Sequence, residues 1–225
     1  MTEREPVGTF ECDAILFDLD GVLVDSQAVV VRTWQEWAVE KDLDARRILE
    51  VAHGRRPAEV VRLFAPHLDA DAEARELERM ETNDLEGVLE IEGARELLSS
   101  LPADGWTVVT SGTRVLASGR MEHVGLPLPE RFVSADDVEN GKPHPEAYLK
   151  GAEILGVSPE ACVVVEDAPS GVSSARSAGM RVIAVATTYR EDDLHEADAV
   201  VASLTDIQAT LLDGSGPRFE LRVTG

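Results

Sequence analysis

The sequence of 225 residues lacks long apolar runs. No stretch approaches the ~20 consecutive apolar residues that a transmembrane helix needs, and no basic segment followed by an apolar one stands at its start. These two absences argue against a membrane span and a secretory leader. We therefore expect a cytoplasmic protein without a membrane partner.

Positive charge is scarce as well. Lys and Arg together number 21 against 43 Asp and Glu, so the formal net charge at pH 7 is −22. A surface with this excess of negative charge argues against nucleic acid and anionic membranes as partners. If the substrate is an anion, cationic side chains near the site must overcome the overall negative field.

Cysteine is limited to Cys12 and Cys162. Each stands at the start of an apolar run typical of a strand, and neither has a His or Cys at the spacing of a metal site. We therefore expect two buried free thiols in a reducing compartment, and neither a disulfide nor a cysteine-bound metal.

What the sequence does contain is an alternation of strand and helix patterns. Short β-branched runs predict strands, and apolar residues three and four apart predict helices between them. This alternation implies right-handed βαβ units in an α/β fold with a doubly wound, Rossmann-like parallel sheet. The predicted strands cover residues 13–17, 106–110, 161–165, 181–185 and 198–201, with a weaker one at 131–134, and two predicted helices cover 93–101 and 145–155.

The stretch from 25 to 90 breaks the alternation. It contains no convincing strand, and it carries helical patterns at about 26–40, 57–66 and 70–82. A helical insertion directly after the first strand predicts a small α-helical cap over the crevice of the main domain. We expect a core domain of residues 1–24 and 91–225 and a cap domain of residues 25–90.

The two ends of the chain carry weaker signals. Residues 1–9, MTEREPVGT, predict a solvated tail. Residues 204–225 contain a Gly-Ser-Gly-Pro turn and an alternating Phe-Glu-Leu-Arg-Val run, for which we expect an edge strand.

Two aspartates follow the first core strand. Asp18 and Asp20 come directly after an apolar run, and Gly21 permits a backbone turn that a β-carbon would obstruct. One carboxylate of such a pair can act as a nucleophile while the other transfers protons. Asp-x-Asp alone is common at strand ends, so the pattern gains specificity only from Gly21 and Val22 after it.

A hydroxyl and a lysine stand at two further loops. Ser111 precedes Gly112 and a helical pattern, where a helix N-terminus would suit a phosphate, although an ordinary helix N-cap has the same pattern. Lys142 is restrained between Gly141 and Pro143, unlike the mobile lysines of a protein surface. This restraint favours a functional role for Lys142.

Glu166 and Asp167 end another apolar run and indicate a hard cation, or the N-cap of the helix that follows. If they converge with Asp18 and Asp20, like charges ~4 Å apart repel by ~4 kcal/mol per pair at an effective dielectric constant near ~20. One lysine cannot offset this repulsion together with a phosphate dianion, whereas Mg²⁺ can. The combination predicts metal-assisted phosphoryl transfer through an aspartyl-phosphate.

Four segments, with a helical insertion after the first, resemble the haloacid dehalogenase superfamily of phosphohydrolases over nearly the whole chain. They are FDLDGVLVDS at 17–26, VVTSGT at 108–113, NGKPHP at 140–145 and VVVEDAPSG at 163–171. Within the superfamily the chain is most similar to the bacterial sugar and polyol phosphatases. That similarity is carried by HGRRP at 53–57, GVLEIEGA at 87–94, TSGTR at 110–114 and GKPHPEAYL at 141–149.

The resemblance implies a role for each of these positions. Asp18 would be the nucleophile, and Asp20 would protonate the leaving oxygen and then activate water. Ser111, Lys142 and the backbone N–H of Gly112 would bind the transferring phosphoryl group. The implied activity is that of a Mg²⁺-dependent phosphatase of a small phosphorylated sugar or polyol.

The resemblance also implies the metal ligands. Mg²⁺ would be held by the carboxylates of Asp18 and Asp167 and by the backbone carbonyl of Asp20. Glu166 would be either a neighbour of these ligands or an alternative ligand.

The cap determines substrate choice in this superfamily. His53, Arg55, Arg56 and Arg62 form a small basic group in an otherwise acidic chain. The group predicts contacts with an anionic substrate, although a solvated helix start would carry the same residues. His53, next to Gly54 in an apparent loop, is the sharpest candidate among them.

Three other functions compete with the phosphatase. A phosphomutase like β-phosphoglucomutase shares fold, metal and nucleophile, but that branch has a histidine twelve residues after the nucleophile, where this chain has Val30. Haloacid dehalogenases proper need no metal and lack the second acid, which Asp20 supplies here. A non-catalytic binding protein would not need every catalytic residue type. The expected partner is a small phosphorylated metabolite, and the expected state is a monomer or weak homodimer.

Overall fold

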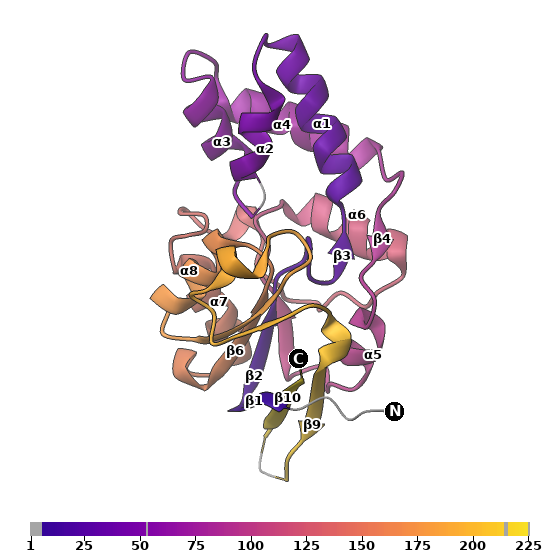
Figure 1. Cartoon of the computed structure of the whole chain (residues 1–225), viewed down its shortest axis with the longest axis vertical. Coiled ribbons are helices and arrows are strands. Elements are labelled where there is room, and N and C mark those ends of the chain that lie inside the picture. The colour runs from indigo at the N-terminus through magenta and orange to yellow at the C-terminus, as the bar shows by residue number, and fades with distance from the viewer. Residues whose placement is uncertain (1–5, 53, 214–215, 225) are drawn as a thin grey trace.

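The β-branched runs of the sequence form a five-stranded parallel sheet in the computed structural model, which describes residues 6–52, 54–213 and 216–224. Helices flank this sheet, and a helical unit lies above it (Figure 1). In chain order the elements are β1 (Pro6–Cys12), β2 (Ala14–Phe17), β3 (Val24–Asp25), α1 (Gln27–Glu40), α2 (Ala45–Ala52), α3 (Pro57–Phe64), α4 (Ala70–Asn83), β4 (Leu89–Glu90), α5 (Ala94–Ser99), β5 (Trp106–Val108), α6 (Arg114–Val124), α7 (Glu146–Leu155), β6 (Cys162–Glu166), α8 (Pro169–Ser177), β7 (Arg181–Val185), β8 (Ala199–Val201), β9 (Ile207–Leu211) and β10 (Phe219–Thr224).

The parallel sheet has the strand order β5-β2-β6-β7-β8. The first core strand, β2, is therefore flanked by β5 on one side and β6 on the other, and the chain reverses its direction of travel across the sheet beside β2. At the last residue of β2, Phe17 pairs with Val108 of β5 and Val165 of β6. Such a reversal is where open α/β sheets form their ligand crevice, at the carboxyl ends of the strands.

Alternate residues of β2 enter two separate apolar cores. Ile15 and Phe17 pack in a cluster that includes residues of α5 and α6, whereas Ala14 and Leu16 pack in a cluster that includes residues of α7 and α8. Successive side chains of a strand point to opposite faces, so each face of the sheet is covered by its own pair of helices. The predicted doubly wound sheet is confirmed.

The inserted helices α1 to α4 bury a third core of their own. Trp34 and Trp37 of α1 meet edge to face, with ring centroids 5.4 Å apart, and pack with Ile48, Val61 and Leu77 from the other three helices. Three of the helices match predicted stretches. The sequence patterns did not indicate α2, which packs against α1 and α3.

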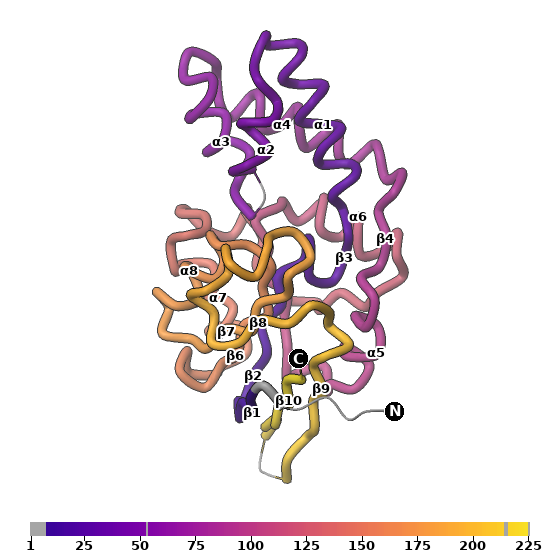
Figure 2. The backbone as a smooth tube through the Cα atoms, in the orientation of Figure 1, coloured from indigo at the N-terminus to yellow at the C-terminus, as the bar shows by residue number. Residues whose placement is uncertain are grey.

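A two-stranded ribbon joins this helical cap to the core (Figure 2). Val24 and Asp25 of β3 pair in antiparallel fashion with Glu90 and Leu89 of β4. Both chain crossings between core and cap therefore run side by side. The domain boundaries at 24/25 and 90/91 remain a prediction; the first falls within this ribbon and the second at its end.

The structure corrects the expectations for both chain ends. The predicted solvated tail is wrong for the described residues from Pro6 onward, because β1 pairs with β10 from Pro6 to Cys12. The expected edge strand is also wrong, because β10 lies between β1 and β9 in a three-stranded antiparallel sheet. β9 and β10 are neighbours in the chain, whereas β1 lies at its other end, so no local pattern reveals the pairing of β1 with β10.

The weak strand signal at 131–134 corresponds to a single bridge. Val133 donates its N–H to the Val108 carbonyl and accepts from the Thr110 N–H, both at 2.9 Å. This segment thus supports the end of β5 without extending the sheet.

The expectation of two buried free thiols is confirmed. Cys12 and Cys162 are free and buried, and burial raises the pKa of each thiol to about 12. Among the described residues, no helix is both long and apolar enough to cross a membrane.

Phe219 tests whether the antiparallel sheet belongs to the core. Its side chain is fully buried, and its ring lies so close to Gly105 that a β-carbon there would be 2.3 Å away. We expect Phe219→Ala to lower the free energy of unfolding by about 3–5 kcal/mol in urea titrations. Arg222→Ala, at an exposed position of the same strand, should change it by less than about 0.5 kcal/mol. Equal effects would contradict this packing.

Candidate active site

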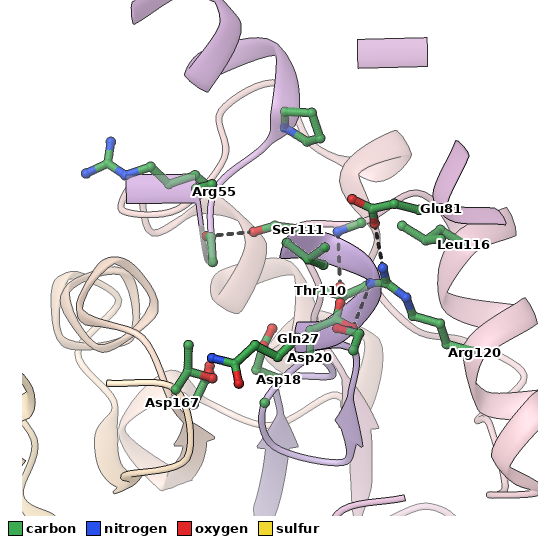
Figure 3. A pocket seen from close by; sticks show the side chains of 18 of the residues that line it. Asp18, Asp20, Gln27, Arg55, Glu81, Thr110, Ser111, Leu116, Arg120 and Asp167 are labelled. Atoms are coloured by element: carbon green, nitrogen blue, oxygen red, sulfur yellow. Dashed lines mark hydrogen bonds and ion pairs between the residues drawn. The ribbon is translucent and has the colours of Figure 1, made fainter. Parts of the chain in front are cut away.

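The polar segments after β2, β5 and β6 meet at one edge of the sheet (Figure 3). Asp18 follows β2 directly, Thr110 and Ser111 lie just beyond β5, and Asp167 follows β6. All of these strands are parallel and adjacent, so their carboxyl ends open into the same crevice. Residues separated by about 150 positions in the sequence are thereby brought together.

Lys142 is buried among the acids. Its Nζ donates to Asp18 Oδ1 at 2.6 Å, to Glu166 Oε1 at 2.7 Å and to the Val109 carbonyl at 3.1 Å. These three acceptors use all three donors of the ammonium group. Burial lowers the pKa of Lys142, but the adjacent carboxylates outweigh it and raise that pKa above its usual range. Lys142 is therefore a fixed cation that orients Asp18.

Glu166 holds Lys142 in place and is itself fixed by several hydrogen bonds. Its Oε1 also accepts from the Tyr148 hydroxyl at 3.0 Å, and its Oε2 accepts from the backbone N–H groups of Asp167 and Ala168, both at 2.8 Å. Both carboxylate oxygens thus have two protein donors. Gly171 makes this possible, because a β-carbon on it would lie 1.5 Å from Glu166 Oε1.

Asp167 completes a group of three acids. One oxygen each of Asp18, Glu166 and Asp167 lies within 4.8 Å of the other two, and all three residues are buried. Gly21 is required here, because it has a φ of +82° and a β-carbon would come within 2.0 Å of Asp167 Oδ2. The glycine therefore lets the loop after β2 close against Asp167.

The electrostatics of this group are unfavourable without another cation. Burial and the neighbouring Glu166 raise the pKa of Asp18 to about 7, although Lys142 opposes the shift. Burial, Glu166 and Asp18 also raise the pKa of Asp167 well above its usual range. One lysine thus compensates only part of three carboxylates. Hard oxygen donors with uncompensated negative charge fit a divalent cation such as Mg²⁺.

Ser111 and Gly112 lie at the crevice, and neither is the N-cap of α6. That helix is capped by Thr113, whose side-chain oxygen accepts from the Leu116 N–H. The Ser111 hydroxyl donates to the Gly54 carbonyl of the cap at 3.0 Å, and the Gly112 N–H donates to the Thr110 hydroxyl at 3.1 Å. The N-cap alternative for Ser111 is therefore wrong.

Asp20 is held through one of its two oxygens. Its Oδ1 accepts from the Ser26 hydroxyl and from Arg120 Nη1, both at 2.7 Å. Its Oδ2 accepts no hydrogen bond within the described part of the chain. Asp20 lies outside the three-acid group and lines the crevice beside it.

The crevice is a small cavity of about 90 Å³ between core and cap. Asp18, Asp20 and Asp167 lie on its core side and Arg55 on its cap side (Figure 3). Trp34 of the cap also lines it. A second cavity of about 310 Å³ adjoins it and shares residues of both core and cap with it. The two adjoining cavities offer room for a compact substrate.

The structure divides the basic group of the cap. Arg55 lines the cavity, with its guanidinium turned away from the carboxylates (Figure 3). Arg56 instead donates to the backbone carbonyls of residues 135, 138 and 139 in the core. Arg62 pairs with Asp71 at the cap surface. His53 lies outside the described residues.

Sequence patterns did not single out Arg120, Glu81 or Tyr148. Arg120 of α6 pairs with Asp20 and with Glu81 of α4, and both Arg120 and Glu81 are buried. Each stands where an apolar residue is expected, Arg120 four residues after Leu116 and Glu81 four residues after Leu77. A charged residue on the buried stripe of a helix was thus the available signal.

Comparisons with known proteins agree with this geometry. The sequence profile of the family described as "Haloacid dehalogenase-like hydrolase" matches residues 15–185. Hexitol phosphatase A of Escherichia coli (strain K12) is 45% identical over 204 residues, which are 88% of this chain and 94% of that protein. Glycerol-1-phosphate phosphohydrolase 2 of Saccharomyces cerevisiae is 37% identical over 200 residues, covering 84% of this chain and 80% of the relative.

Solved structures share the whole arrangement of core and cap. A hydrolase from Pseudomonas syringae superposes with a TM-score of 0.77 at 25% sequence identity, covering 87% of this chain and 95% of that one. The similarity therefore extends over nearly the full length of both chains.

The acid group predicts a pH-dependent stability in metal-free protein. The pKa of Asp18, about 7, lies above the ordinary 3.8, so the folded protein binds more protons than the unfolded chain between these values. Its stability should fall as pH rises through that window. Asp167→Asn removes one repelling charge and should raise Tm at pH 8 by roughly 2–4 °C per kcal/mol gained.

Thermal unfolding in EDTA between pH 4 and pH 8 measures this effect. Asp104→Asn, at an exposed position, serves as the control and should leave Tm unchanged at every pH. If Asp167→Asn lowers Tm at pH 8, or its effect does not grow with pH, the three acids do not repel one another as described.

Proposed function

From the premise that the chain belongs to the haloacid dehalogenase-like hydrolases and is a phosphoric monoester hydrolase, we propose that it is a Mg²⁺-dependent phosphatase of a small phosphorylated polyol or sugar, acting through an aspartyl-phosphate on Asp18. The main support is one geometric observation. Asp18 and Asp167, at the ends of the adjacent strands β2 and β6, place oxygens within 4.8 Å of each other beside the buried Lys142.

The first half-reaction transfers the phosphoryl group to Asp18. A carboxylate oxygen of Asp18 attacks phosphorus, and the bond between phosphorus and the ester oxygen breaks. The leaving oxygen takes a proton from the carboxyl group of Asp20 and departs as the alcohol. Lys142 keeps Asp18 in position and offsets negative charge as it accumulates.

The second half-reaction releases phosphate. The Asp20 carboxylate formed in the first step accepts a proton from a water molecule, whose oxygen attacks phosphorus. The bond between phosphorus and Asp18 breaks, so inorganic phosphate leaves and both aspartates return to their starting states. The walls contributed by the cap limit access of bulk water to the site.

The acid group is suited to Mg²⁺. We propose that Asp18 and Asp167 hold the ion together with the Asp20 carbonyl. Glu166 would lie behind them, because both of its oxygens already have two protein donors. When bound, Mg²⁺ supplies positive charge against the clustered acids and polarises the phosphoryl oxygens.

Ser111 and Gly112 are the proposed donors to the phosphoryl oxygens. The Ser111 hydroxyl can rotate from the Gly54 carbonyl toward a bound phosphate, and Gly112 lines the same cavity, with its N–H donating to the Thr110 hydroxyl in this structure. Among the basic residues of the cap, Arg55 remains the candidate for substrate contact because it lines the cavity.

The size of the cavity and the relatives support the proposed substrate class. A hexitol phosphatase and a glycerol-1-phosphate phosphohydrolase are similar over most of the chain, so polyol phosphates are the first candidates. The mutase alternative lacks support from the site, because Val30 lines the cavity and cannot transfer protons. We further propose a cytoplasmic monomer or weak homodimer.

Asp18→Asn tests the nucleophile. The amide cannot attack phosphorus, so we expect phosphate release to fall by roughly 10⁴-fold or more, with an unchanged circular dichroism spectrum. Asp13→Asn, at an exposed position just before the opposite end of β2, should retain full activity. Retained turnover in Asp18→Asn would refute the assignment.

A phosphate-release screen tests substrate and metal together. The panel contains sorbitol 6-phosphate, glycerol phosphates, glucose 6-phosphate and a bisphosphate, each with Mg²⁺ and with EDTA. We expect polyol monophosphates to be hydrolysed with Mg²⁺, and activity to be lost in EDTA and restored by excess Mg²⁺. Mg²⁺ at 100 times its Kd should also stabilise the fold by about 2.7 kcal/mol. Full activity in EDTA would exclude the metal.

A further inference from the structure

A buried ion triad joins the cap to the proposed proton donor. Arg120 of α6 donates through Nη1 to Asp20 Oδ1 at 2.7 Å and through Nη2 to Glu81 Oε2 at 2.5 Å. Arg120 is 2% exposed and Glu81 is 7% exposed. Figure 3 shows the guanidinium between the two carboxylates at the side of the cavity.

A contribution to stability alone does not explain this triad. Buried ion pairs contribute little net stability, because removing both charges from water costs about as much as their attraction returns. Burial raises the pKa of Glu81 even though Arg120 lies beside it. The buried Nε of Arg120 has no partner in the described chain. Within the described residues, the hydrogen bonds of its guanidinium go to the two carboxylates, which thus fix its orientation.

The three members come from two bodies of the protein. Asp20 and Arg120 belong to the core, whereas Glu81 lies near the end of α4 in the cap. The triad is complete only while the cap is seated on the core, as it is in this structure. The position of the cap on the core therefore determines whether Nη2 of Arg120 has its carboxylate partner.

Nη1 of Arg120 binds Asp20 directly. Together with the Ser26 hydroxyl it anchors Oδ1 of the carboxyl group. With Oδ1 fixed twice, the group can rotate little, and Oδ2 is the oxygen left for a substrate in the cavity that Asp20 lines. The orientation of Asp20 is thus tied to the orientation of Arg120.

We propose that Arg120 and Glu81 are positioning residues for Asp20, and that seating of the cap completes them. Glu81 fixes the planar guanidinium, and the guanidinium presents Oδ2 of Asp20 to the leaving oxygen. The proton then moves from Oδ2 to that oxygen as its bond to phosphorus breaks and the bond from Asp18 forms. The inference rests on the proposed function, in which Asp20 is the proton donor.

The identity of the leaving group separates this role from a structural one. An alkoxide from a sugar or polyol is a poor leaving group and needs the proton, whereas p-nitrophenolate leaves without one. Loss of a positioned general acid typically costs 10²–10⁴-fold. A defect in the position of Asp20 should therefore reduce hydrolysis of an alkyl phosphate far more than hydrolysis of p-nitrophenyl phosphate.

Glu81→Gln is the decisive variant, because it keeps the shape and removes the charge that holds Arg120. We expect kcat/KM for sorbitol 6-phosphate to fall roughly 10–100-fold, and kcat/KM for p-nitrophenyl phosphate to change less than about threefold. The ratio kcat/KM is the proper measure, since it reports the steps up to transfer of the phosphoryl group to Asp18.

Glu78→Gln is the matched control. Glu78 lies one turn earlier on the same helix, and it also bridges cap and core by accepting from the Thr113 hydroxyl, without a contact to Arg120. If Glu81 merely fastens the cap, the two variants should behave alike and affect both esters equally. We expect the leaving-group dependence only in Glu81→Gln.

A second variant keeps the test decisive if Glu81→Gln does not fold. Lysine in Arg120→Lys carries one nitrogen and cannot hold two carboxylates in the same way. It should show the same ester-dependent loss, and the double variant should lose little more than either single one. Loss that is equal for both esters, or full activity in both single variants, would overturn the inference. Wild-type protein that hydrolyses neither ester with Mg²⁺ would instead overturn the proposed function, and this inference with it.

Discussion

The structure depends on burying three carboxylates against a single ammonium group. Asp18, Glu166 and Asp167 lie at the ends of two adjacent strands, and Lys142 reaches two of them from a loop of another segment. Like charges in such a position repel, so the fold must hold them by other means. It does so through the parallel sheet, the Tyr148 hydroxyl, two backbone N–H groups and glycines at positions 21 and 171 that permit close approach. The residual negative charge is what makes the site suitable for a divalent cation and a phosphate.

The cap covers the site and also makes specific contacts with the core. Its loop supplies the Gly54 carbonyl to Ser111, and Arg56 ties it to three carbonyls of the segment from 135 to 139, close to the loop that carries Lys142. Its helix α4 supplies Glu81 to the guanidinium beside Asp20. The Gly54 and Glu81 contacts reach segments that carry the proposed site residues Ser111 and Arg120, and the Arg56 contacts reach the segment just before the loop of Lys142. In this structure the contacts that hold the cap on the core thus also hold residues around the proposed site, and the cap walls limit the access of water to it.

Expectations from the sequence succeeded where a local pattern has one structural solution. The apolar β-branched runs had to be buried strands, and the helical stretch after Asp25 had to be an insertion because it interrupts a parallel sheet. The expectations failed where a segment pairs with another that lies far away in the chain. Nothing near Pro6 indicates that it begins a strand paired with β10. The role of Arg56 was missed for the same reason, because the sequence shows a cation at this position but not the distant backbone carbonyls that it binds.

By itself, the sequence determined the fold class, the family and the identity of the residues at the strand ends, because periodicity and residue chemistry are local properties. Only the tertiary structure decided which of these residues touch. In the structure both oxygens of Glu166 accept hydrogen bonds from protein donors. Arg55 lines the cavity whereas Arg56 binds backbone carbonyls of the core. Arg120 and Glu81 lie beside Asp20. Contacts of this kind depend on angles between helices and strands that are distant in the chain, and those angles are set by the packing of three apolar cores rather than by any segment alone.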